Sequence, residues 1–371
     1  MNSSEIRGAL GSTLELYNPI KTSGIKIITL GQMKEVHKLT GEIINNLNPG
    51  ALNQMLSGSE GDLDKLLGIL NEESFNVLYG KAGLIKDANI MYLEKLQQSV
   101  EETFRIENLN YFIISVLPEF EVNWHHLEWG QIAMRWKKFA VLAARDHGKS
   151  FFFSNAFPIW KMYRYKSPSE FIGKPRKELT LCDKGFLLTN ENDLAKDLLE
   201  ICKTTIEENP TLNKKLMNPN KDNWGKEGIR CKNGALLRIK SYGSNFRGRH
   251  PGYIIVDDYL KDNVIYSELQ RRKATDYFHS VIMNAIVPEG QVAVVGTPFH
   301  QADLYGDLKG KKGWKVFEYP GIFPDGHLLW RNRWSFDGLM SKREEQGSLI
   351  FSREILIKPI SSESTIFPYS V

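Results

Sequence analysis

Hydrophobic positions change their spacing along this chain, and the change divides it into three regions. Residues 1–108 are polar and rich in Asn and Gly, and leucines between positions 63 and 70 repeat with helical spacing. We predict a helical appendage of unknown role there. Residues 109–312 alternate short apolar runs with amphipathic stretches, which is typical of strands alternating with helices. Residues 313–371 contain a last strand-like run and then a polar lid or linker segment.

The apolar runs after the first region predict strands. They are FAVLAA (139–144), LTLCDKGFLLTN (179–190), ALLRIKSYG (235–243), GYIIVDD (252–258), QVAVVGTP (291–298) and WKVFEYPG (314–321). Helical spacing over 150–165, 191–208 and 267–286 predicts helices between them, and we expect Pro210 to close the second helix. Short apolar strands that alternate with amphipathic helices favour a mostly parallel sheet flanked by helices. The predicted fold class is therefore α/β.

Composition indicates the class of protein but not its chemistry. With 371 residues, of which 42% are hydrophobic, the chain can bury one large core or two moderate ones. No apolar run approaches the roughly 18 residues of a membrane span, and the start MNSSEIRG lacks the apolar stretch of a secretion signal. We expect an intracellular protein with no membrane partner. The widely spaced Cys182, Cys202 and Cys231 predict buried free thiols rather than disulfides or a zinc site.

Positive charge is concentrated in two segments. The formal net charge of +4 is too small to indicate a nucleic-acid partner by itself. However, residues 135–177 contain eleven Lys or Arg against two acids, and residues 226–249 contain seven against one. Such segments are usually solvated faces, and the alternative is contact with the backbone phosphates of DNA.

The run VLAARDHGKS, from Val141 to Ser150, is the first candidate for chemistry. It resembles the phosphate-binding pattern GxxxxGK[ST], although Ala143 stands where the first Gly is expected. Backbone N–H groups of such a loop cradle phosphates, its Lys reaches the β- and γ-phosphates, and its hydroxyl holds Mg²⁺. The predicted nucleotide-binding residues of the loop are Ala144, Arg145, Asp146, His147, Gly148, Lys149 and Ser150. Because GK[ST] triplets also arise by chance, the neighbouring motifs must decide.

Two carboxylates follow a second buried run. GYIIVDD delivers Asp257 and Asp258 to the carboxyl edge of the sheet, where ligands sit in α/β folds. This is the form of a Walker B strand, in which Asp257 joins Ser150 in holding Mg²⁺ and Asp258 orients or deprotonates the attacking water. The two acids share the role of base if the register is wrong by one. Asp257 follows Lys149 by 108 residues, which leaves room for an extra strand and favours motor-type ATPases.

Two further loops complete the set of candidates for catalysis. Thr297 ends the run QVAVVGTP, where a hydroxyl can sense the γ-phosphate or the attacking water. The loop GSNFRGRHPG (243–252) precedes the Walker B strand, and its Arg247 or Arg249 can stabilise charge on the transferring phosphoryl group. The alternative for either Arg is an ordinary solvated loop cation.

A segment rich in aromatic residues, WHHLEWGQIAMRWKKF (124–139), precedes the phosphate loop. Gln131 is a candidate to hydrogen-bond adenine, and Trp124 or Trp129 to stack on it. Aromatic residues at this spacing are also typical of a core. The paired histidines in this segment, at 125 and 126, have no metal-ligand partners nearby in the sequence, so we expect them to be structural.

Taken together, AARDHGKS, GSNFRGRHPGYIIVDD and VVGTPFH resemble the ATPase domain of the large terminase subunit of tailed bacteriophages. That domain is an ASCE-type, RecA-like P-loop NTPase, the motor that pumps DNA into procapsids. The segment LLWRNRWSFDGLMSKREEQGSLIFSREILIKPI (328–360) is similar to the passage from ATPase to nuclease domain in the same family. The resemblance covers roughly residues 110–370.

The resemblance implies roles for several residues. Arg145 matches an Arg near the start of the family's loop, which contacts phosphate or acts as a conformational switch. Lys149 and Ser150 match the phosphate and Mg²⁺ residues. Arg247 matches an Arg that acts in trans on the ATP of a neighbouring subunit, and Thr297 falls on the motif that couples hydrolysis to domain movement. The sequence does not decide whether Arg145, Arg247 or both serve as the arginine finger.

The chain departs from the family pattern in three places. Many terminases carry Glu where Asp258 stands, so the attacking water must lie closer to the backbone or be reached differently. Ala143 in place of Gly removes backbone freedom at the start of the loop. The family's metal-dependent nuclease domain is not supplied after Pro359, so we expect this chain to hydrolyse ATP and not to cut DNA, with nuclease activity only in a longer parent protein.

The function implied is a Mg²⁺-dependent ATPase that translocates double-stranded DNA through sequence-independent backbone contacts. The implied partners are the portal protein, the small terminase subunit and further copies in a ring on the capsid, in the host cell cytoplasm, and an isolated domain can be monomeric. One alternative is a superfamily 2 helicase-like translocase, although the roughly 70 residues after Thr297 are too few for its second RecA-like domain. The other is a nucleotide-binding assembly module without turnover, against which the intact motor residues argue.

Overall fold

The computed structural model describes residues 101–171, 173–246, 248–261 and 266–359. These residues belong to two compact units, which are described separately. The first unit contains 101–134 and 170–175, and the second contains 135–169 and 176–359. Within the described ranges, no helix combines the length and apolar character needed to cross a bilayer.

Two helices of the first unit, which follow a helical segment at 101–107, pack closely. They are α7 (Leu109–Val116) and α8 (Trp124–Arg135), the latter running one residue into the second unit. Asn108 begins α7, because its side chain accepts a hydrogen bond of 3.0 Å from the backbone N–H of Tyr111. The Asn110 side chain packs against Gly130, where a Cβ would lie only 1.8 Å from Asn110 Oδ1. The amide of Asn110 donates to the carbonyl of Leu127 at 2.8 Å.

The second unit is built on a seven-stranded sheet in the order β3-β4-β2-β5-β6-β1-β7. The strands are β1 (Lys138–Ala143), β2 (Lys184–Thr189), β3 (Gly228–Arg230), β4 (Leu236–Ser241), β5 (Tyr253–Asp257), β6 (Gln291–Gly296) and β7 (Lys315–Tyr319). All neighbouring pairs are parallel except β3 and β4. The central strands β1, β2, β5 and β6 are almost wholly buried, as expected for a parallel sheet covered on both faces.

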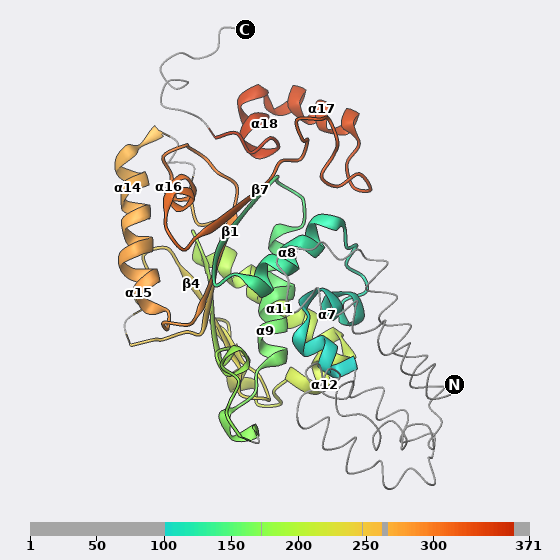
Figure 1. The fold of residues 1–371 in the computed structure, drawn as a ribbon, viewed down its shortest axis with the longest axis vertical. Helices are drawn as coiled ribbons and strands as arrows, with labels where there is room; N and C mark the ends of the chain where they lie inside the picture. Colours follow the sequence, from blue (N-terminus) through green and yellow to red (C-terminus); the bar gives the residue numbers. More distant parts are fainter. Residues whose placement is uncertain (1–100, 172, 247, 262–265, 360–371) are drawn as a thin grey trace, which may run out of the picture. The chain divides into compact units, whose positions relative to one another are not determined.

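Helices cover both faces of this sheet (Figure 1). Figure 1 shows α14, α15 and α16 on one side and α9 and α11 on the other. The helices are η2 (Phe151–Ala156), α9 (Phe157–Arg164), η3 (Pro168–Glu170), α10 (Lys177–Thr180), α11 (Asn192–Glu208), α12 (Pro210–Leu216), η4 (Lys221–Asn223), α14 (Glu268–Tyr277), η5 (Phe278–Ile282), α15 (Met283–Ala285), α16 (Leu304–Gly310), α17 (Phe336–Gln346) and α18 (Ser348–Glu354). The predicted α/β class is confirmed. One strand, β6, separates β1, which leads into the phosphate-loop pattern, from β5, which ends in Asp257, and this is the extra strand for which the spacing of Lys149 and Asp257 leaves room.

One local expectation needs correction, and two features of the structure go beyond the predictions. The strand predicted from position 179 begins only at Lys184, and α10 precedes it, since Leu179 and Cys182 are both buried at helical spacing. Pro210 does more than close α11: it begins α12, capped by the Asn209 side chain, which accepts from two backbone N–H groups at 3.1 Å. The short antiparallel strand β3 was not predicted, because three residues at a sheet edge leave little periodicity. The three cysteines are buried free thiols, as predicted.

Candidate nucleotide-binding site

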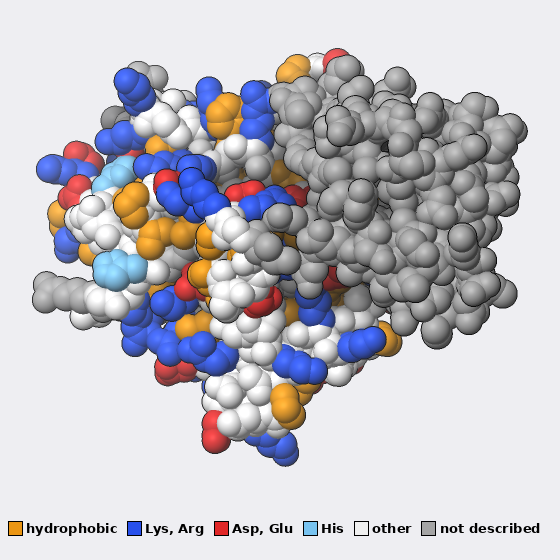
Figure 2. Space-filling view, turned by 60° about the horizontal axis from the view of Figure 1, so that its bottom comes forward, with side chains coloured by type: hydrophobic (Ala, Val, Ile, Leu, Met, Phe, Trp, Pro, Cys, Tyr) orange, Lys and Arg blue, Asp and Glu red, His pale blue; other side chains and the backbone are white. Residues whose placement is uncertain are grey.

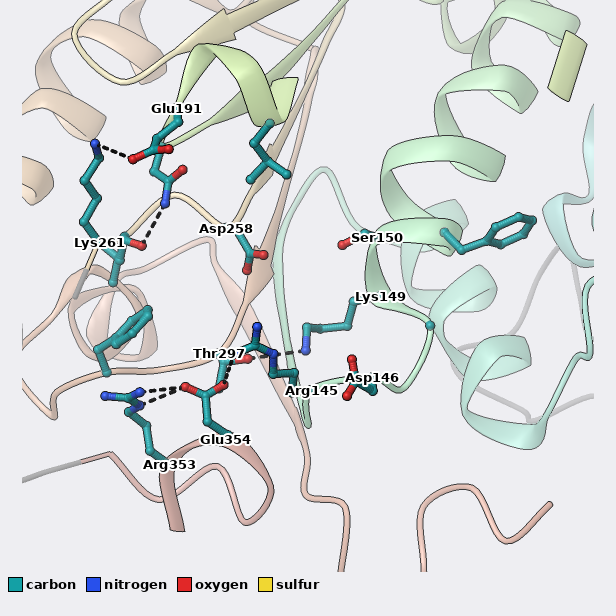
Figure 3. A pocket seen from close by; sticks show the side chains of 16 residues that line it. Arg145, Asp146, Lys149, Ser150, Glu191, Asp258, Lys261, Thr297, Arg353 and Glu354 are labelled. Carbon is teal, nitrogen blue, oxygen red and sulfur yellow. Dashed lines mark hydrogen bonds and ion pairs between the residues drawn. The ribbon is translucent and has the colours of Figure 1, made fainter. Parts of the chain in front are cut away.

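The carboxyl ends of the adjacent strands β5, β6 and β1 meet at one edge of the sheet, and a cavity of about 840 Å³ opens there (Figure 3). Ligands bind at this edge in open α/β sheets. The cavity is lined by Arg145, Asp146, Gly148, Lys149, Ser150, Phe151, Asn190, Glu191, Leu194, Asp258, Leu260, Lys261, Thr297, Phe299, Arg353 and Glu354. Residues of three motifs therefore line one cavity, although the first and the last of these motifs lie more than 100 residues apart in the sequence.

The loop between β1 and η2 is shaped by two left-handed residues. Asp146 has a φ of 62° and Gly148 a φ of 84°. Such values suit Gly, and Asp tolerates them better than most residues. The start of the loop is held from two sides, because the N–H of Ala144 donates to Tyr319 O at 3.0 Å and the N–H of Arg145 donates to Glu354 O at 2.9 Å. The helix that begins at Phe151 directs its N-terminus to the cavity, which favours an anion there.

Lys149 extends back over its own loop. Its ammonium donates to Ala143 O at 2.5 Å, to Ala144 O at 2.9 Å and to Thr297 Oγ1 at 3.3 Å. Burial lowers the pKa of Lys149, whereas the charges of Asp258 and Asp257 raise it. Among the residues that the structure describes, no carboxylate lies within ion-pair distance of this ammonium. A buried cation held only by neutral oxygens can take an anionic ligand without first breaking a salt bridge.

Asp257 ends β5 and is 1% exposed. Its Oδ2 accepts a hydrogen bond of 2.6 Å from the hydroxyl of Ser154, and its Oδ1 has no hydrogen-bond partner among the described residues. Burial and the neighbouring Asp258 raise the pKa of Asp257, while hydrogen bonds from Ser154 and Ser150 and the charge of Lys149 lower it. An orphaned buried carboxylate oxygen of this kind fits a divalent cation.

The residues present fit Mg²⁺ in the way that phosphate-linked sites hold it. Asp257 and the hydroxyl of Ser150 would be its protein ligands. Within the described ranges, no group of three His, Cys, Asp or Glu side chains forms a dedicated metal cage. Mg²⁺ commonly binds through one or two protein oxygens, and water and substrate phosphates complete its octahedral shell.

Asp258 differs from Asp257 in exposure and backbone. It is exposed, lines the cavity and has a φ of 43°. Its N–H donates to Val295 O at 3.3 Å, and its carbonyl accepts from the N–H of Asn190 at 3.2 Å, so both flanking strands fix its position. Figure 3 shows its carboxylate facing the side of the cavity that carries Lys149 and Ser150.

Two other loop residues predicted to bind nucleotide are held by the segment around α17. Asp146 forms an ion pair of 3.0 Å with Lys342, and this ammonium also lies 4.1 Å from the ring centroid of Trp334. His147 is fully buried, its Nδ1 lies 2.7 Å from Arg145 O, and its ring stacks near Trp334 with centroids 6.3 Å apart. Ala144 is also fully buried. These side chains therefore shape the loop, and among them only Asp146 lines the cavity.

The structure does not test most of the remaining predicted residues. Gln131 and Trp129 are buried in α8, which also carries Trp124, and this part of α8 belongs to the first unit. The adenine role assigned to them stays a prediction. Arg247 lies outside the described residues. Arg249 is exposed in the same loop and does not line the cavity.

Sequence reasoning missed several charged and polar cavity residues: Asn190, Glu191, Lys261, Arg353 and Glu354. The first two follow β2, so the rule that placed Asp257 and Asp258 at the sheet edge also applies to them. Lys261 forms an ion pair of 2.9 Å with Glu191. Arg353 and Glu354 belong to α18, and no motif marks them, because tertiary packing alone brings this helix to the site.

No family model and no curated protein sequence matches this chain. Solved structures similar to it include the large terminase ATPase domain of Thermus phage P74-26, at 14% identity and a TM-score of 0.46 over 67% of this chain and 97% of that one. A mutant of that domain is 13% identical, with a TM-score of 0.47 over 67% of this chain and 98% of that one. The large terminase of bacteriophage HK97 is 15% identical, with a TM-score of 0.45 over 69% of this chain and 55% of that one. We assign no function from similarities at this level.

Proposed function

We propose that this chain is the ATPase motor domain of a viral large terminase subunit, which hydrolyses ATP with Mg²⁺ and moves double-stranded DNA into a procapsid. The observation that supports this most is the placement of Lys149, a buried ammonium resting on loop carbonyls, beside a cavity that Asp258 also lines. An ammonium in this position is a counter-charge for phosphate. In this proposal residues 109–312 form the ATPase core, 313–371 the last strand and a linker, and 1–108 an appendage of unknown role.

The site residues divide the work of phosphoryl transfer to water. Backbone N–H groups of the loop and Lys149 bind the β- and γ-phosphates, and Ser150 and Asp257 hold Mg²⁺, which neutralises charge on the phosphate oxygens when bound. Asp258 orients the attacking water and accepts its proton. Thr297 shares a hydrogen bond with Lys149, so its hydroxyl responds to the position of that ammonium.

A guanidinium completes the proposed site. Arg145 supplies it within the chain, or Arg247 supplies it to the nucleotide of a neighbouring copy, and Arg stabilises the charge spread over the transferring phosphoryl group. The 69% exposure of the Arg145 side chain at the cavity supports its role within the chain.

Basic surface residues are the proposed contacts with DNA. Lys161 and Arg164 of the first basic segment are buried, so they are not available to phosphates. The exposed cations of the two segments in the second unit include Lys137, Lys138, Lys226, Arg230, Lys232 and Arg249. Figure 2 shows several groups of Lys and Arg on the described part of one face. Portal protein, small terminase subunit and a ring of copies in the host cytoplasm are the further partners and setting that we propose.

The direct test of the ATPase is Lys149→Ala in a steady-state hydrolysis assay with Mg²⁺ and ATP. We expect turnover to be lost, because the variant removes the cation that contacts the phosphates. Lys309→Ala is the matched control, since this exposed lysine of α16 pairs only with Glu318 on the surface. Near-normal turnover in Lys149→Ala, or no hydrolysis by the unmodified chain with or without DNA, would contradict the proposal and favour an assembly module without turnover.

A mixing experiment tests whether Arg247 acts in trans. Inactive Arg247→Ala subunits are added in increasing proportion to unmodified protein under conditions in which the chains assemble. A trans role predicts a nonlinear change in activity with the mixing ratio, because each defective copy also impairs its neighbour. A linear response would indicate that Arg247 acts within its own chain.

A further inference from the structure

The last residue of α18, Glu354, is a buried carboxylate shared by two guanidinium groups. Its Oε1 accepts hydrogen bonds from Arg353 Nε at 3.0 Å and Nη2 at 2.8 Å. Its Oε2 lies 3.8 Å from Arg145 Nη1, which is an ion-pair distance but too long for a hydrogen bond. The side chains of Glu354 and Arg353 are 9% and 13% exposed, whereas that of Arg145 is 69% exposed. Glu354 therefore holds Arg353 tightly and Arg145 loosely.

The backbone fixes Glu354 beside the phosphate loop. The N–H of Arg145 donates to the carbonyl of Glu354 at 2.9 Å, so the two residues stay close whatever their side chains do. The Arg353 guanidinium lies 4.9 Å from the ring centroid of Phe299, two residues after Thr297. All of these side chains line the same cavity, and Figure 3 shows Arg145, Arg353 and Glu354 grouped below Thr297. The backbone of Glu354 is thus fixed beside the loop, and its carboxylate is held firmly by Arg353. The contact with Arg145 is the one that can break.

We infer that Glu354 is a positioning residue for Arg145. In the nucleotide-free site it holds the Arg145 guanidinium at the rim of the cavity, and the more highly charged triphosphate takes this guanidinium over on binding. Arg353 stays with Glu354, so the buried carboxylate is never left without a cation, which would be costly. This inference rests on the proposed function, because it requires that the cavity bind a nucleoside triphosphate.

Release of Arg145 has a consequence for the chain beyond β7. In the structure the ion pair and the backbone hydrogen bond both join the loop to α18. After exchange only the backbone hydrogen bond remains, so nucleotide binding loosens the connection between the phosphate loop and α18. The sequence contains no signal for this link, since Glu354 belongs to none of the nucleotide-binding motifs.

The test is a double-mutant cycle on nucleotide affinity, measured by calorimetric titration with a nonhydrolysable ATP analogue and Mg²⁺. Glu354→Gln keeps the size of the side chain and removes its hold on Arg145, so we expect the analogue to bind roughly two- to fivefold more tightly, which is within the range for exposed charge pairs. Arg145→Gln should weaken binding. In the Arg145→Gln background, Glu354→Gln should change affinity by less than about twofold, because no guanidinium remains to be released.

Equal tightening by Glu354→Gln in both backgrounds would overturn the inference, since it would show only a general charge effect. Glu344→Gln, an exposed acid near the end of α17, is the matched control and should bind the analogue as the unmodified chain does. If Glu354→Gln does not fold, Arg353→Met replaces it in the cycle. Arg353→Met should weaken binding of the analogue, because Glu354 then holds Arg145 more tightly. This effect should vanish in the Arg145→Gln background. If the unmodified chain does not bind the analogue, the proposed function itself is contradicted. This outcome differs from additive effects of Glu354→Gln and Arg145→Gln on affinity, which would contradict only the inference about Glu354.

Discussion

Protonation of His147 is expected to destabilise the second unit in mild acid. The ring is fully buried in the phosphate loop, and its Nδ1 lies 2.7 Å from the carbonyl of Arg145, which makes Nδ1 the donor in the neutral ring. Burial lowers the pKa of His147 to about 4; the charges of Lys149 and Arg333 also lower it, whereas the hydrogen bond to Arg145 and the charge of Asp146 raise it. The folded chain therefore keeps this ring neutral at pH values where an unfolded chain protonates it.

The size of the effect follows from the two pKa values. In the unfolded chain a histidine titrates near 6.5, and each unit of difference corresponds to about 1.4 kcal/mol. Below pH 6.5 the unfolded state binds a proton that the folded state does not, so the free energy of unfolding falls as the pH is lowered. The loss is about 2 kcal/mol at pH 5 and approaches about 3.4 kcal/mol below pH 4. Above pH 7 it is close to zero.

The perturbation that isolates this effect is His147→Asn. The Asn amide can donate to the Arg145 carbonyl from nearly the same position as Nδ1, but it does not titrate. Urea unfolding followed by tryptophan fluorescence at pH 7, 6 and 5 gives the free energy of unfolding for each protein. The unmodified chain should lose about 2 kcal/mol more than the variant between pH 7 and pH 5, whatever constant difference the substitution introduces.

His250→Asn, at an exposed histidine, is the matched control variant. If the chain and His147→Asn lose stability in parallel, to within about 0.5 kcal/mol, the buried neutral ring is not the cause and the reasoning is wrong.

Three further predictions concern packing and DNA. Gly252→Ala should lower the free energy of unfolding by about 3 kcal/mol, because its Cβ would lie 1.8 Å from the carbonyl oxygen of Leu181. Gly310→Ala is the control and should change the free energy of unfolding by less than about 0.5 kcal/mol, because nothing lies within 4 Å of its Cβ. Equal urea midpoints for the two variants would contradict this prediction. Tyr253→Phe should raise the free energy of unfolding by about 1 kcal/mol, because the buried hydroxyl has no hydrogen-bond partner among the described residues; a decrease would reveal a partner such as water. Affinity for double-stranded DNA should fall about tenfold or more between about 50 and about 200 mM salt, and a flat response in a filter-binding assay would exclude phosphate contacts as the main source of affinity.

The parts of the site that the sequence predicts are those whose signal is local. Asp257 ends β5, Thr297 directly follows β6, and Lys149 lies in the loop after β1, so a buried parallel strand leads to each of them at the carboxyl edge of the sheet. Each position could therefore be predicted without knowing the strand order. The order itself, with β6 between β1 and β5, brings the three strand ends together and is visible only in the structure.

The missed residues depend on contacts between distant segments. Glu354 follows Arg145 by 209 positions, and α18 reaches the loop because its small core of Leu339, Phe351 and Ile355 packs it against α17. A pattern of apolar residues predicts the two helices but not the surface against which they lie. Glu191 is a different case, because it follows β2 and the reasoning used for Asp257 was available for it.

We propose that Asp258 rather than Asp257 is the base, a choice that the sequence left open. Asp257 is buried, one of its carboxylate oxygens is held by Ser154, and it is not among the residues that line the cavity. Asp258 is exposed to the cavity and adopts a φ of 43°, a conformation that non-glycine residues adopt only at a free-energy cost. Of the three described non-glycine residues with positive φ, Asp146 and Asp258 both line the cavity. In this proposal the left-handed turn directs the Asp258 carboxylate into the cavity, and it compensates for a side chain one methylene shorter than Glu.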